Sequence, residues 1–450
     1  MSAVELSDNG YRRELGGGLV LRWSTPADVE GVAALYSAAF RTKREDPLNP
    51  HVAFWTRDMF SGRHPLISPY DFAVVADTER QVIVAAVCLI SYICTYDGIP
   101  FGFGRPEVVA SLPDYRRQGL IRAIFELIHA RSAAQGQLVQ GITGIPYYYR
   151  QFGYEYALNL GGPRLVYFPA IPRLKPDQTE PYILRDASEE ELPRVMALHE
   201  REHASSLVTA HVDAAYWRWL LSGMNREALE GWHVQLICSQ GGQAVGYTLS
   251  WRFRWDVALN VGGLAVEPGV ALVAVLPSVL RALQAQAETI RAPRPDTPPA
   301  GALGLVLGTG HPAYEALGEI QTAEVKPYAW YLRVPDLPAF LRHIAPALER
   351  RLAGSAAAGY SGEVALDFYR GGLRLVFEQG RLTTAEDWNM PLWGKAHAGF
   401  PPLVFLQLLF GHRSLDELRY AYPDVWTEDE AGPLLQALFP KQPSHLHPLD

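Results

Sequence analysis

The chain of 450 residues is too long for one compact core, and typical domain sizes predict roughly three domains. Its 48% hydrophobic and 20% charged residues are typical of a soluble globular protein, and no apolar run reaches the roughly 18 residues that span a bilayer. A net charge of −8 argues against binding to nucleic acid and is compatible with a cationic substrate.

Cysteine and histidine usage predicts neither a disulfide framework nor a metal site. The three cysteines, Cys88, Cys94 and Cys238, are an odd number, and none stands in a CxxC pair. We interpret the 13 histidines as scattered residues, so no metal is expected. The N-terminal segment lacks the apolar stretch of a signal peptide. Together these features predict a protein of the reducing cytoplasm that does not insert into a membrane.

Two pairs of stretches resemble each other and indicate an internal duplication. Residues 21–40 (LRWSTPADVEGVAALYSAAF) and 184–203 (LRDASEEELPRVMALHEREH) each read as a short strand followed by an amphipathic helix. Residues 145–156 (IPYYYRQFGYEY) and 311–320 (HPAYEALGEI) share a proline, a tyrosine and a glycine at similar spacing. A duplicated unit predicts two domains of one fold.

Proline-rich, polar composition indicates where the first two domains separate. Residues 171–181 (IPRLKPDQTEP) predict a linker between a first domain of residues 1–170 and a second of residues 181–333. A similar stretch at 292–302 lies inside the second domain and reads as a surface loop.

The pattern changes again in residues 334–450, which we predict to be a third, α+β domain. Residues 335–354 read as one amphipathic helix, and residues 362–386 alternate apolar and polar residues around glycine turns, as a β-meander does. Residues 402–411 and 432–439 read as closing helices.

The stretch from residue 109 to 130 (VASLPDYRRQGLIRAIFELIHA) joins a strand to an amphipathic helix through a turn. Residues 81–113 supply two or three strands, the last at 107–112. The helix carries apolar residues at positions i, i+4, i+7 and i+8 counted from Leu120, so one face would pack on the sheet.

Arginines gather at the start of this helix, at Arg116, Arg117 and Arg122. A helix N-terminus carries partial positive charge, so it disfavours cations. A bound anion would resolve the conflict: the first-turn N–H groups point outward, and Gly119 lets a ligand approach the backbone. The pattern therefore predicts a pyrophosphate cradle, with solvated arginines on an ordinary strand–turn–helix as the alternative.

Arg-x-x-Gly after a strand of the form Val-x-x-x-Pro resembles the coenzyme A loop of the Gcn5-related N-acetyltransferases (GNAT). Three stretches, spread over most of the chain, resemble the Eis (enhanced intracellular survival) subfamily. In order they are RRQGLIRA, YYYRQFGYEYA and, near the C-terminus, PPLVFLQLLFGHRSLDELRYAYPDV. The resemblance implies an α/β (α+β) fold: tandem GNAT domains, the second degenerate, followed by a sterol-carrier-protein-like domain.

The resemblance also implies acetyl-CoA as the acetyl donor. Its pantetheine arm would pair with a strand end, as an added β-strand does, and its pyrophosphate would rest on the loop and first helical turn. Ile121 departs from the small residue of the tight GNAT pattern, as in the Eis proteins. The binding residues implied are Val109, Ala110, Ser111, Arg117, Gln118, Gly119, Leu120, Ile121, Arg122, Gly144 and Ile145.

Tyr149 matches the family's proton-donating tyrosine, because it lies three residues before Phe152 in the motif YRQFGY. A proton donor would assist the leaving thiolate of coenzyme A. The neighbouring Tyr147 and Tyr148 are interpreted as packing residues.

An alkylammonium acceptor, with a pKa of roughly 10, must lose a proton before it attacks. In Eis proteins the terminal carboxylate accepts that proton, which implies Asp450 here, although the familiar pattern ends in an aromatic residue. His445 and His447 lie nearby in sequence. A disordered tail with a water chain as base is the remaining alternative.

The second unit keeps a strand end at residues 264–283 but has no Arg-x-x-Gly after it, so we expect one active site per chain. Tyr314 is interpreted as a relic or packing residue. The resemblance implies an aminoglycoside- or polyamine-like cation, or a lysine side chain, as the acceptor, and a homohexamer. Trp23, Tyr36 and Phe40 are acceptor-pocket candidates by analogy, and core packing is the preferred interpretation.

A different class of function is a scaffold that binds coenzyme A or a lipid without turnover. Trp388, Trp393, Phe400 and Phe405 would line an apolar cavity of the third domain in that case, or belong to its core. The arginine loop together with Tyr149 favours the enzyme, because a scaffold requires no such pair.

Overall fold

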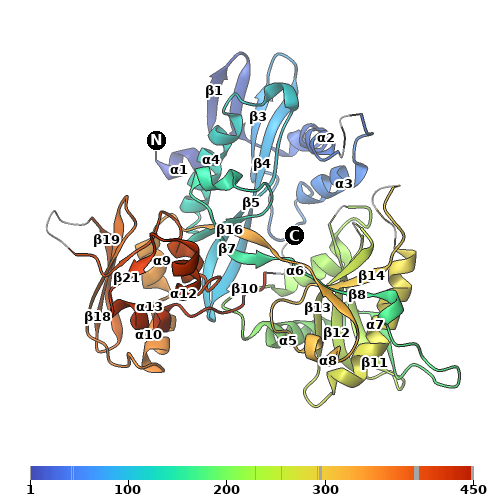
Figure 1. Ribbon diagram of the computed structural model, residues 1–450. Coiled ribbons are helices and arrows are strands. Elements are labelled where there is room, and N and C mark those ends of the chain that lie inside the picture. Colours follow the sequence, from blue (N-terminus) through green and yellow to red (C-terminus); the bar gives the residue numbers. More distant parts are fainter. Residues whose placement is uncertain are drawn as a thin grey trace.

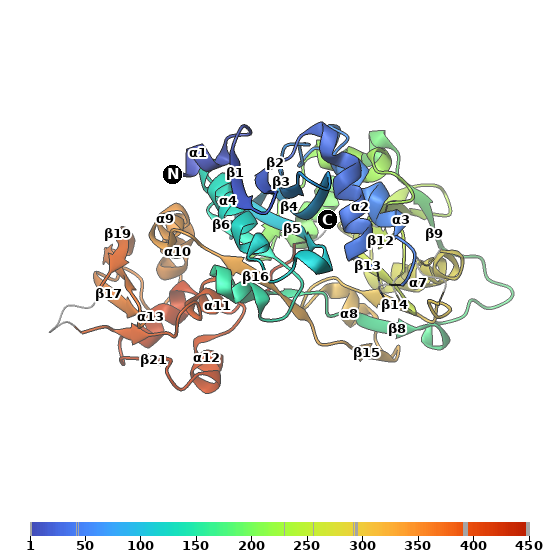
Figure 2. The ribbon, with the colours of Figure 1, turned by 90° about the horizontal axis from the view of Figure 1, so that it is seen from above.

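The computed structural model describes residues 2–41, 43, 45–228, 230–254, 256–290, 292, 296–389 and 395–446, and the description below refers to these residues. They form three β-sheets, each in its own lobe. In Figure 1 the first lobe (blue to cyan) is at the top, the second (green to yellow) at the lower right and the third (orange to red) at the left. The view from above in Figure 2 places the second and third lobes at opposite ends of the molecule.

The first sheet has the strand order β1-β2-β3-β4-β5-β6-β16-β7, and β10 pairs with β4. Its strands are β1 (Arg12–Gly16), β2 (Leu19–Trp23), β3 (Phe72–Asp77), β4 (Val82–Tyr96), β5 (Ile99–Ser111), β6 (Val139–Ile142), β16 (Tyr328–Arg333), β7 (Glu155–Leu160) and β10 (Val208–Ala210). Its helices are α1 (Ala3–Ser7), α2 (Val29–Ala39), α3 (Pro50–Met59) and α4 (Leu120–Ala134). The apolar stripe of α4 is buried as expected, because it packs on β3, β4 and β5.

The second sheet has the order β15-β8-β14-β13-β12-β11-β9. Its strands are β15 (Thr322–Glu324), β8 (Arg164–Tyr167), β14 (Ala302–Leu305), β13 (Ala258–Val266), β12 (Ala244–Trp251), β11 (Trp232–Ser239) and β9 (Tyr182–Asp186). The accompanying helices are α5 (Leu192–His203), α6 (Ala214–Arg218), α7 (Leu272–Thr289) and α8 (Pro312–Ala316).

The third sheet has the order β19-β18-β17-β20-β21 and continues the α+β pattern expected from residue 334 onward. Its strands are β17 (Gly362–Asp367), β18 (Gly372–Glu378), β19 (Arg381–Trp388), β20 (Ala398–Gly399) and β21 (Trp426–Thr427). Its helices are α9 (Leu337–His343), α10 (Ala345–Ala353), α11 (Phe405–Leu409), α12 (Leu415–Ala421) and α13 (Ala431–Leu438).

Two local expectations are corrected. The single helix expected at 335–354 is broken at Ile344, because Pro346 has no N–H to continue the hydrogen-bond ladder and instead starts α10. Within 81–113 the expectation of two or three strands is confirmed, but the last one, expected at 107–112, begins at Ile99; the two strands are β4 and β5. They are joined by a two-residue turn at Asp97 and Gly98, both with positive φ, as a tight hairpin requires.

The first two sheets exchange one strand each. β16, which follows the second unit in sequence, inserts antiparallel between β6 and β7 of the first sheet, and β8, which follows the first unit, inserts antiparallel between β14 and β15 of the second. Figure 1 shows the exchange by colour, with orange β16 beside β7 and green β8 among yellow strands. The expected boundaries at residues 170 and 333 therefore do not separate the two sheets.

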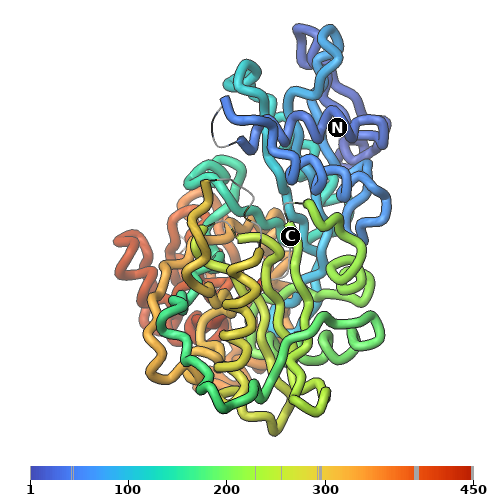
Figure 3. Tube along the Cα trace, turned by 90° about the vertical axis from the view of Figure 1, so that its right-hand side faces the viewer, coloured from blue at the N-terminus to red at the C-terminus, as the bar shows by residue number. Residues whose placement is uncertain are grey.

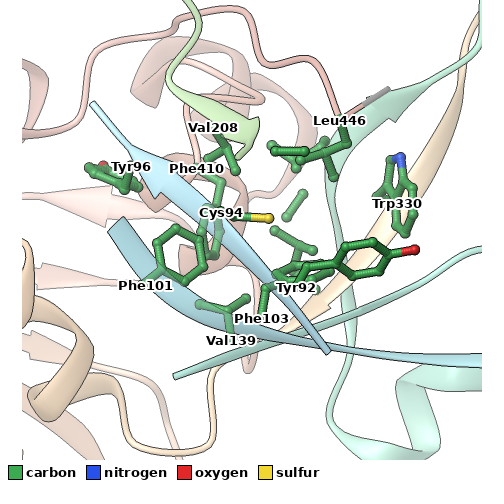
Figure 4. Packing of buried hydrophobic residues seen from close by; sticks show 14 of the residues in the cluster. Tyr92, Cys94, Tyr96, Phe101, Phe103, Val139, Val208, Trp330, Phe410 and Leu446 are labelled. Carbon is green, nitrogen blue, oxygen red and sulfur yellow. The ribbon is translucent and has the colours of Figure 1, made fainter. Parts of the chain in front are cut away.

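The β4–β5 hairpin extends from the first lobe into the centre, where all three lobes meet. There the Tyr96 hydroxyl donates to the Leu409 carbonyl of the third lobe (2.7 Å). Figure 4 shows Cys94 and Phe103 of the hairpin packed with Val208, Trp330, Phe410 and Leu446, residues that lie far apart in sequence. The core is thus shared between the lobes.

The last described residues return to this centre. The backbone N–H of Leu207 donates to the Pro443 carbonyl (2.7 Å), and that of His445 donates to the Val208 carbonyl (2.9 Å). In Figure 3 the described C-terminal end lies near the middle of the molecule. No helix in the described ranges combines the length and apolar character needed to cross a membrane.

The strand exchange predicts which sheet is destabilised when a buried side chain of β16 is shortened. Leu332 is fully buried between β6 and β7, so Leu332→Ala should cost about 2–5 kcal/mol and speed amide exchange in those strands of the first sheet. Leu303→Ala in β14 is the matched control and should act on β8 and β13 instead. Hydrogen-exchange mass spectrometry reads both; Leu332→Ala acting mainly on the second sheet would contradict the exchange.

Candidate active site

Strand β5 has an open edge at the centre of the first lobe. In the described chain it pairs in parallel with β6 at Phe103–Val139 and Gly104–Gln140, and beyond Gly104 the two strands diverge. The opposite edge of β5 stays paired with β4 as far as Ser111. An extended ligand arm can therefore add to the open edge through backbone hydrogen bonds.

A β-bulge interrupts β5 beside this open edge. Glu107 pairs with Cys88 and Ala110 with Ala86, so two residues of β5 oppose one of β4, and Val108 has φ of 52°. A bulge changes the direction of the side chains around it and locally disrupts the hydrogen bonds between the paired strands. Glu107 and the residues after it are thereby turned relative to the rest of the strand.

The turn after β5 presents the start of α4 to solvent. Gly119 caps the helix with φ of 77°, and a Cβ there would meet no atom within 4 Å, so a ligand can approach its backbone. Arg117, also at positive φ, and Arg116 and Arg122 are exposed around this turn. The first-turn N–H groups of a helix lack intrahelical partners, so together they form an anion site.

A cavity of about 660 Å³ runs from the open edge of β5 to the start of α4. Its lining consists of Ala39, Phe40, Val109, Ala110, Ser111, Tyr115, Arg116, Arg117, Gly119, Leu120, Ile121, Arg122, Ile145, Tyr148, Gln151 and Phe152. Of the predicted acetyl-CoA residues, the structure brings nine together here. Gln118 lies on the other side of the turn, in a hollow shared with Asp77 and Tyr115. Gly144 adjoins Tyr149 instead.

Tyr149 lies in the 3₁₀ turn Tyr148–Phe152 and is only 3% exposed. A Cβ on Gly144 would lie 3.7 Å from its hydroxyl, so the hydroxyl faces the backbone next to Ile145 at the cavity. Burial, with a further contribution from the charge of Glu107, raises the pKa of Tyr149 above its ordinary value. The hydroxyl therefore keeps its proton at neutral pH and is available as a donor.

The exchanged strand β16 holds the turn that precedes Tyr149. The Tyr328 hydroxyl donates to the Gly144 carbonyl (2.9 Å), and the Tyr331 hydroxyl accepts from the Tyr147 N–H (2.5 Å). Tyr147 itself is 69% exposed, with φ of 61°. The second unit thus supplies the strand that shapes the site of the first.

Glu107 is a carboxylate near this site that the sequence analysis missed. Arg105 pairs with it at 2.5 Å and lies over the Trp330 ring, 4.9 Å from its centroid. The charge of Glu107 contributes to raising the pKa of both Tyr149 and Tyr36, behind burial in each case. The sequence did contain a signal for Glu107, since Arg105 and Glu107 are charged residues in an otherwise apolar strand. Charged residues are rarely buried without a partner, so the two could have been expected to pair.

The three aromatic residues considered for an acceptor pocket differ in their surroundings. Trp23 is buried and its indole N–H donates to the Leu6 carbonyl (2.8 Å). Tyr36 is likewise fully buried in the core. Phe40 is 44% exposed and lines the cavity, so it is available to a ligand.

Of the predicted base candidates, Asp450 and His447 lie outside the described residues. His445 is buried, stacks on His203 of α5 (4.4 Å between ring centroids) and approaches the Gly262 carbonyl (3.4 Å). Its side chain therefore faces the second unit.

The corresponding region of the second unit is unsuited to a pyrophosphate. Residues 267–271 connect β13 to α7, and they begin with Glu267, whose carboxylate pairs with Arg194 (3.3 Å). The Tyr314 hydroxyl donates to the Leu305 carbonyl (3.1 Å) and accepts from the Leu307 N–H (3.2 Å). This tyrosine is thus engaged by its own backbone surroundings.

Comparison with known proteins agrees with this geometry. Residues 21–157 match the acetyltransferase (GNAT) domain family, whereas no curated protein sequence matches the chain. A conserved protein from Enterococcus faecalis, described as a probable N-acyltransferase, is similar in structure, with a TM-score of 0.66 and 14% identity over 95% of this chain and 98% of that one.

Two further solved structures share the fold over nearly the whole chain. A GCN5-related N-acetyltransferase from Kribbella flavida has a TM-score of 0.61 and 19% identity, covering 95% of this chain and 97% of its own. Eis1 from Mycobacterium abscessus has a TM-score of 0.60 and 15% identity, covering 94% and 98%. The chain therefore carries a GNAT-type acetyltransferase domain at residues 21–157, within an overall fold that it shares with Eis1.

Proposed function

We propose that the chain transfers the acetyl group of acetyl-CoA to an amine of a cationic small molecule or of a lysine side chain, at one site per chain. The observation that carries the proposal is the cavity itself. It joins an open strand edge to a cationic helix start, and the hydroxyl of the buried Tyr149 lies next to Gly144, the neighbour of Ile145 in the cavity lining. A scaffold that only binds coenzyme A has no use for that tyrosine.

The donor would lie along the cavity with its pyrophosphate at the start of α4. Backbone N–H groups from Gly119 onward, with Arg117 and Arg122, would bind the phosphates. The pantetheine arm would follow Val109 to Ser111 on the open edge of β5. This orientation directs the thioester toward the point where β5 and β6 diverge.

In the chemical step the amine nitrogen forms a bond to the thioester carbonyl carbon, and the C–S bond then breaks. Backbone N–H groups beside the bulge in β5 would stabilise the oxyanion. Tyr149 would donate its proton to the leaving thiolate and regain one from the nitrogen, which loses a proton as the amide forms. The product is an amide, and coenzyme A leaves as the free thiol.

The incoming ammonium must first lose a proton. The tail packs Leu446 beside Trp330, which contacts Arg105 of the site strand (Figure 4). We propose the terminal Asp450 as the proton acceptor, with Glu107 as the alternative carboxylate.

The acceptor class follows from charge. Glu107, whose side chain is 18% exposed, lies near the proposed transfer point, and the chain has a net charge of −8, so a polycation such as an aminoglycoside or polyamine is favoured over an anion. Phe40 offers an apolar surface to the same ligand. Of the four aromatic residues considered for a cavity in the third lobe, Phe400 and Phe405 pack on each other within the core, Trp388 is half-buried, and Trp393 lies outside the described residues. A sterol-carrier-like third domain, a homo-oligomer and a cytoplasmic location stay predictions.

Charge reversal at the helix start tests donor binding. Arg117→Glu with Arg122→Glu should raise the Kd for acetyl-CoA about 100-fold, because two charge-assisted contacts are lost and repulsion replaces them. Isothermal titration calorimetry gives Kd and stoichiometry, expected at about one per chain. Arg218→Glu with Arg381→Glu, two exposed arginines elsewhere, is the matched control. Equal affinity in both double variants, or two molecules bound per chain, rules the assignment out.

Removal of the Tyr149 hydroxyl tests the chemistry. Tyr149→Phe should lower kcat about 10²–10⁴-fold and leave the Kd for acetyl-CoA unchanged, because only proton donation is lost. Tyr147→Phe is the control and should keep wild-type kcat. Because the pKa of Tyr149 is raised, wild-type kcat should show no alkaline decline from this group below about pH 10. A fully active Tyr149→Phe enzyme would show that another group protonates the thiolate.

Changes at the chain end test the proton acceptor. Deletion of Leu449 and Asp450 should lower kcat about 10²-fold, because it removes the side-chain carboxylate of Asp450 and moves the main-chain carboxylate two residues back. Asp450→Asn removes only the side-chain carboxylate and so distinguishes the two groups. Steady-state assays with a polyamine as the acceptor measure both. If the deletion is fully active and Glu107→Gln is not, the role belongs to Glu107.

A further inference from the structure

Helix α5 carries a metal-binding pattern that the interpretation of scattered histidines overlooked. Residues 199–203 read His-Glu-Arg-Glu-His, with histidines four residues apart. Positions i, i+3 and i+4 share one helix face, which places His199, Glu202 and His203 together. That face is buried: the side chains of Glu202 and His203 are 1% and 4% exposed.

The ligating atoms of these three side chains lie within 4.8 Å of one another. The Nε2 atom of His203 is 3.9 Å from a carboxylate oxygen of Glu202, and the rings of His199 and His203 are 4.4 Å apart. Ligand atoms around a tetrahedral zinc ion, with bonds of roughly 2.0–2.2 Å, lie roughly 3.3–3.5 Å apart. Small rotations of the three side chains would bring their ligand atoms from the observed separations to those around a zinc ion.

The surrounding hydrogen bonds indicate which ring nitrogen of His199 carries the proton. Glu202 accepts from the Tyr247 hydroxyl, from the Leu264 N–H (3.0 Å) and faces His311 Nε2 at 3.2 Å. Because the Tyr247 hydroxyl donates its hydrogen bond to the Glu202 carboxylate, its oxygen accepts a hydrogen bond from Nδ1 of His199 (3.0 Å). His199 therefore holds its proton on Nδ1, and its Nε2 carries the lone pair that a metal needs.

His311 supports the carboxylate rather than competing for a metal. Its Nδ1 accepts from the Ala313 N–H (3.1 Å), so its Nε2 is the protonated nitrogen and donates to Glu202. Such outer hydrogen bonds to a ligating carboxylate and a ligating histidine are the usual support of a metal site.

His203 completes the donor set. Its Nε2 is buried and has no hydrogen-bond partner within the described part of the chain. A buried ring nitrogen without a hydrogen-bond partner, next to the carboxylate of Glu202, is costly unless a ligand binds it.

We propose that His199, Glu202 and His203 bind one transition-metal dication, with zinc the best match to two imidazoles and a carboxylate. Tyr247 and His311 are positioning residues for the ligands. The site is separate from the acetyl-transfer cavity, and its function is structural.

A metal here would stabilise the attachment of the chain end. His445 stacks on His203 with the rings 19° from parallel, and its backbone pairs beside Val208. Fixing His203 fixes the ring against which the tail packs. Metal binding would therefore fix the position of His445, near the end of the described chain.

Metal content of the full chain tests the proposal. Protein purified without an affinity tag, dialysed against a weak chelator and analysed by inductively coupled plasma mass spectrometry should retain about one zinc per chain. His203→Asn should reduce this to background, whereas His233→Asn, on β11 outside the cluster, should not. Wild-type protein stripped of metal and loaded with Co²⁺ should show the visible absorption of tetrahedral cobalt, a readout that needs no variant to fold.

A chelator should also lower the Tm of the wild type and leave that of His203→Asn unchanged. Less than a tenth of an equivalent of retained metal, together with no cobalt spectrum, would overturn the proposal. The cluster would then be a hydrogen-bonded support for the buried Glu202. Neither readout depends on acetyl transfer, so failure here is distinguishable from failure of the proposed activity.

Discussion

The backbone pairing of β16 with β6 and β7 is the constraint on which the site depends. These hydrogen bonds fill the gap that the first unit leaves in its own sheet, and the same strand supplies Tyr328 and Tyr331 to the turn before Tyr149. β8 closes the second sheet in the same way. Because each sheet is completed by the other unit, neither is a self-contained body, and the shared core of the β4–β5 hairpin adds the third lobe.

The two units differ in the region that follows their central strands. In the first unit the splayed strands open beside arginines and a glycine-capped helix, whose partial charges favour an anion. In the second, Glu267 stands at the equivalent connection, Tyr314 is bound to the strand backbone, and His445 of the tail approaches β13. The second cleft is thus adapted to hold the chain's own end, while the first is left free for a ligand.

Local sequence patterns predicted most helices and strands and the turn before α4, because periodicity and the Arg-x-x-Gly motif depend on neighbouring residues. The apolar stripe of α4 and the arginines at its start lie as expected. The strand exchange was out of reach, since β8 and β16 have ordinary strand patterns and only tertiary pairing decides their sheet. Glu107 was missed because its role depends on partners from distant segments. The histidine pair of α5 was readable from the sequence and was overlooked.

The exchange also bears on how the protein is made. During synthesis the strands up to β7 emerge long before β16, which follows roughly 170 residues later. At about 5–20 residues per second, the first sheet waits about 8–34 s with exposed edges between β6 and β7. Unpaired edges invite pairing with other chains. Nascent protein in this interval is therefore the species most exposed to aggregation, and chaperone demand should peak before residue 333 leaves the ribosome.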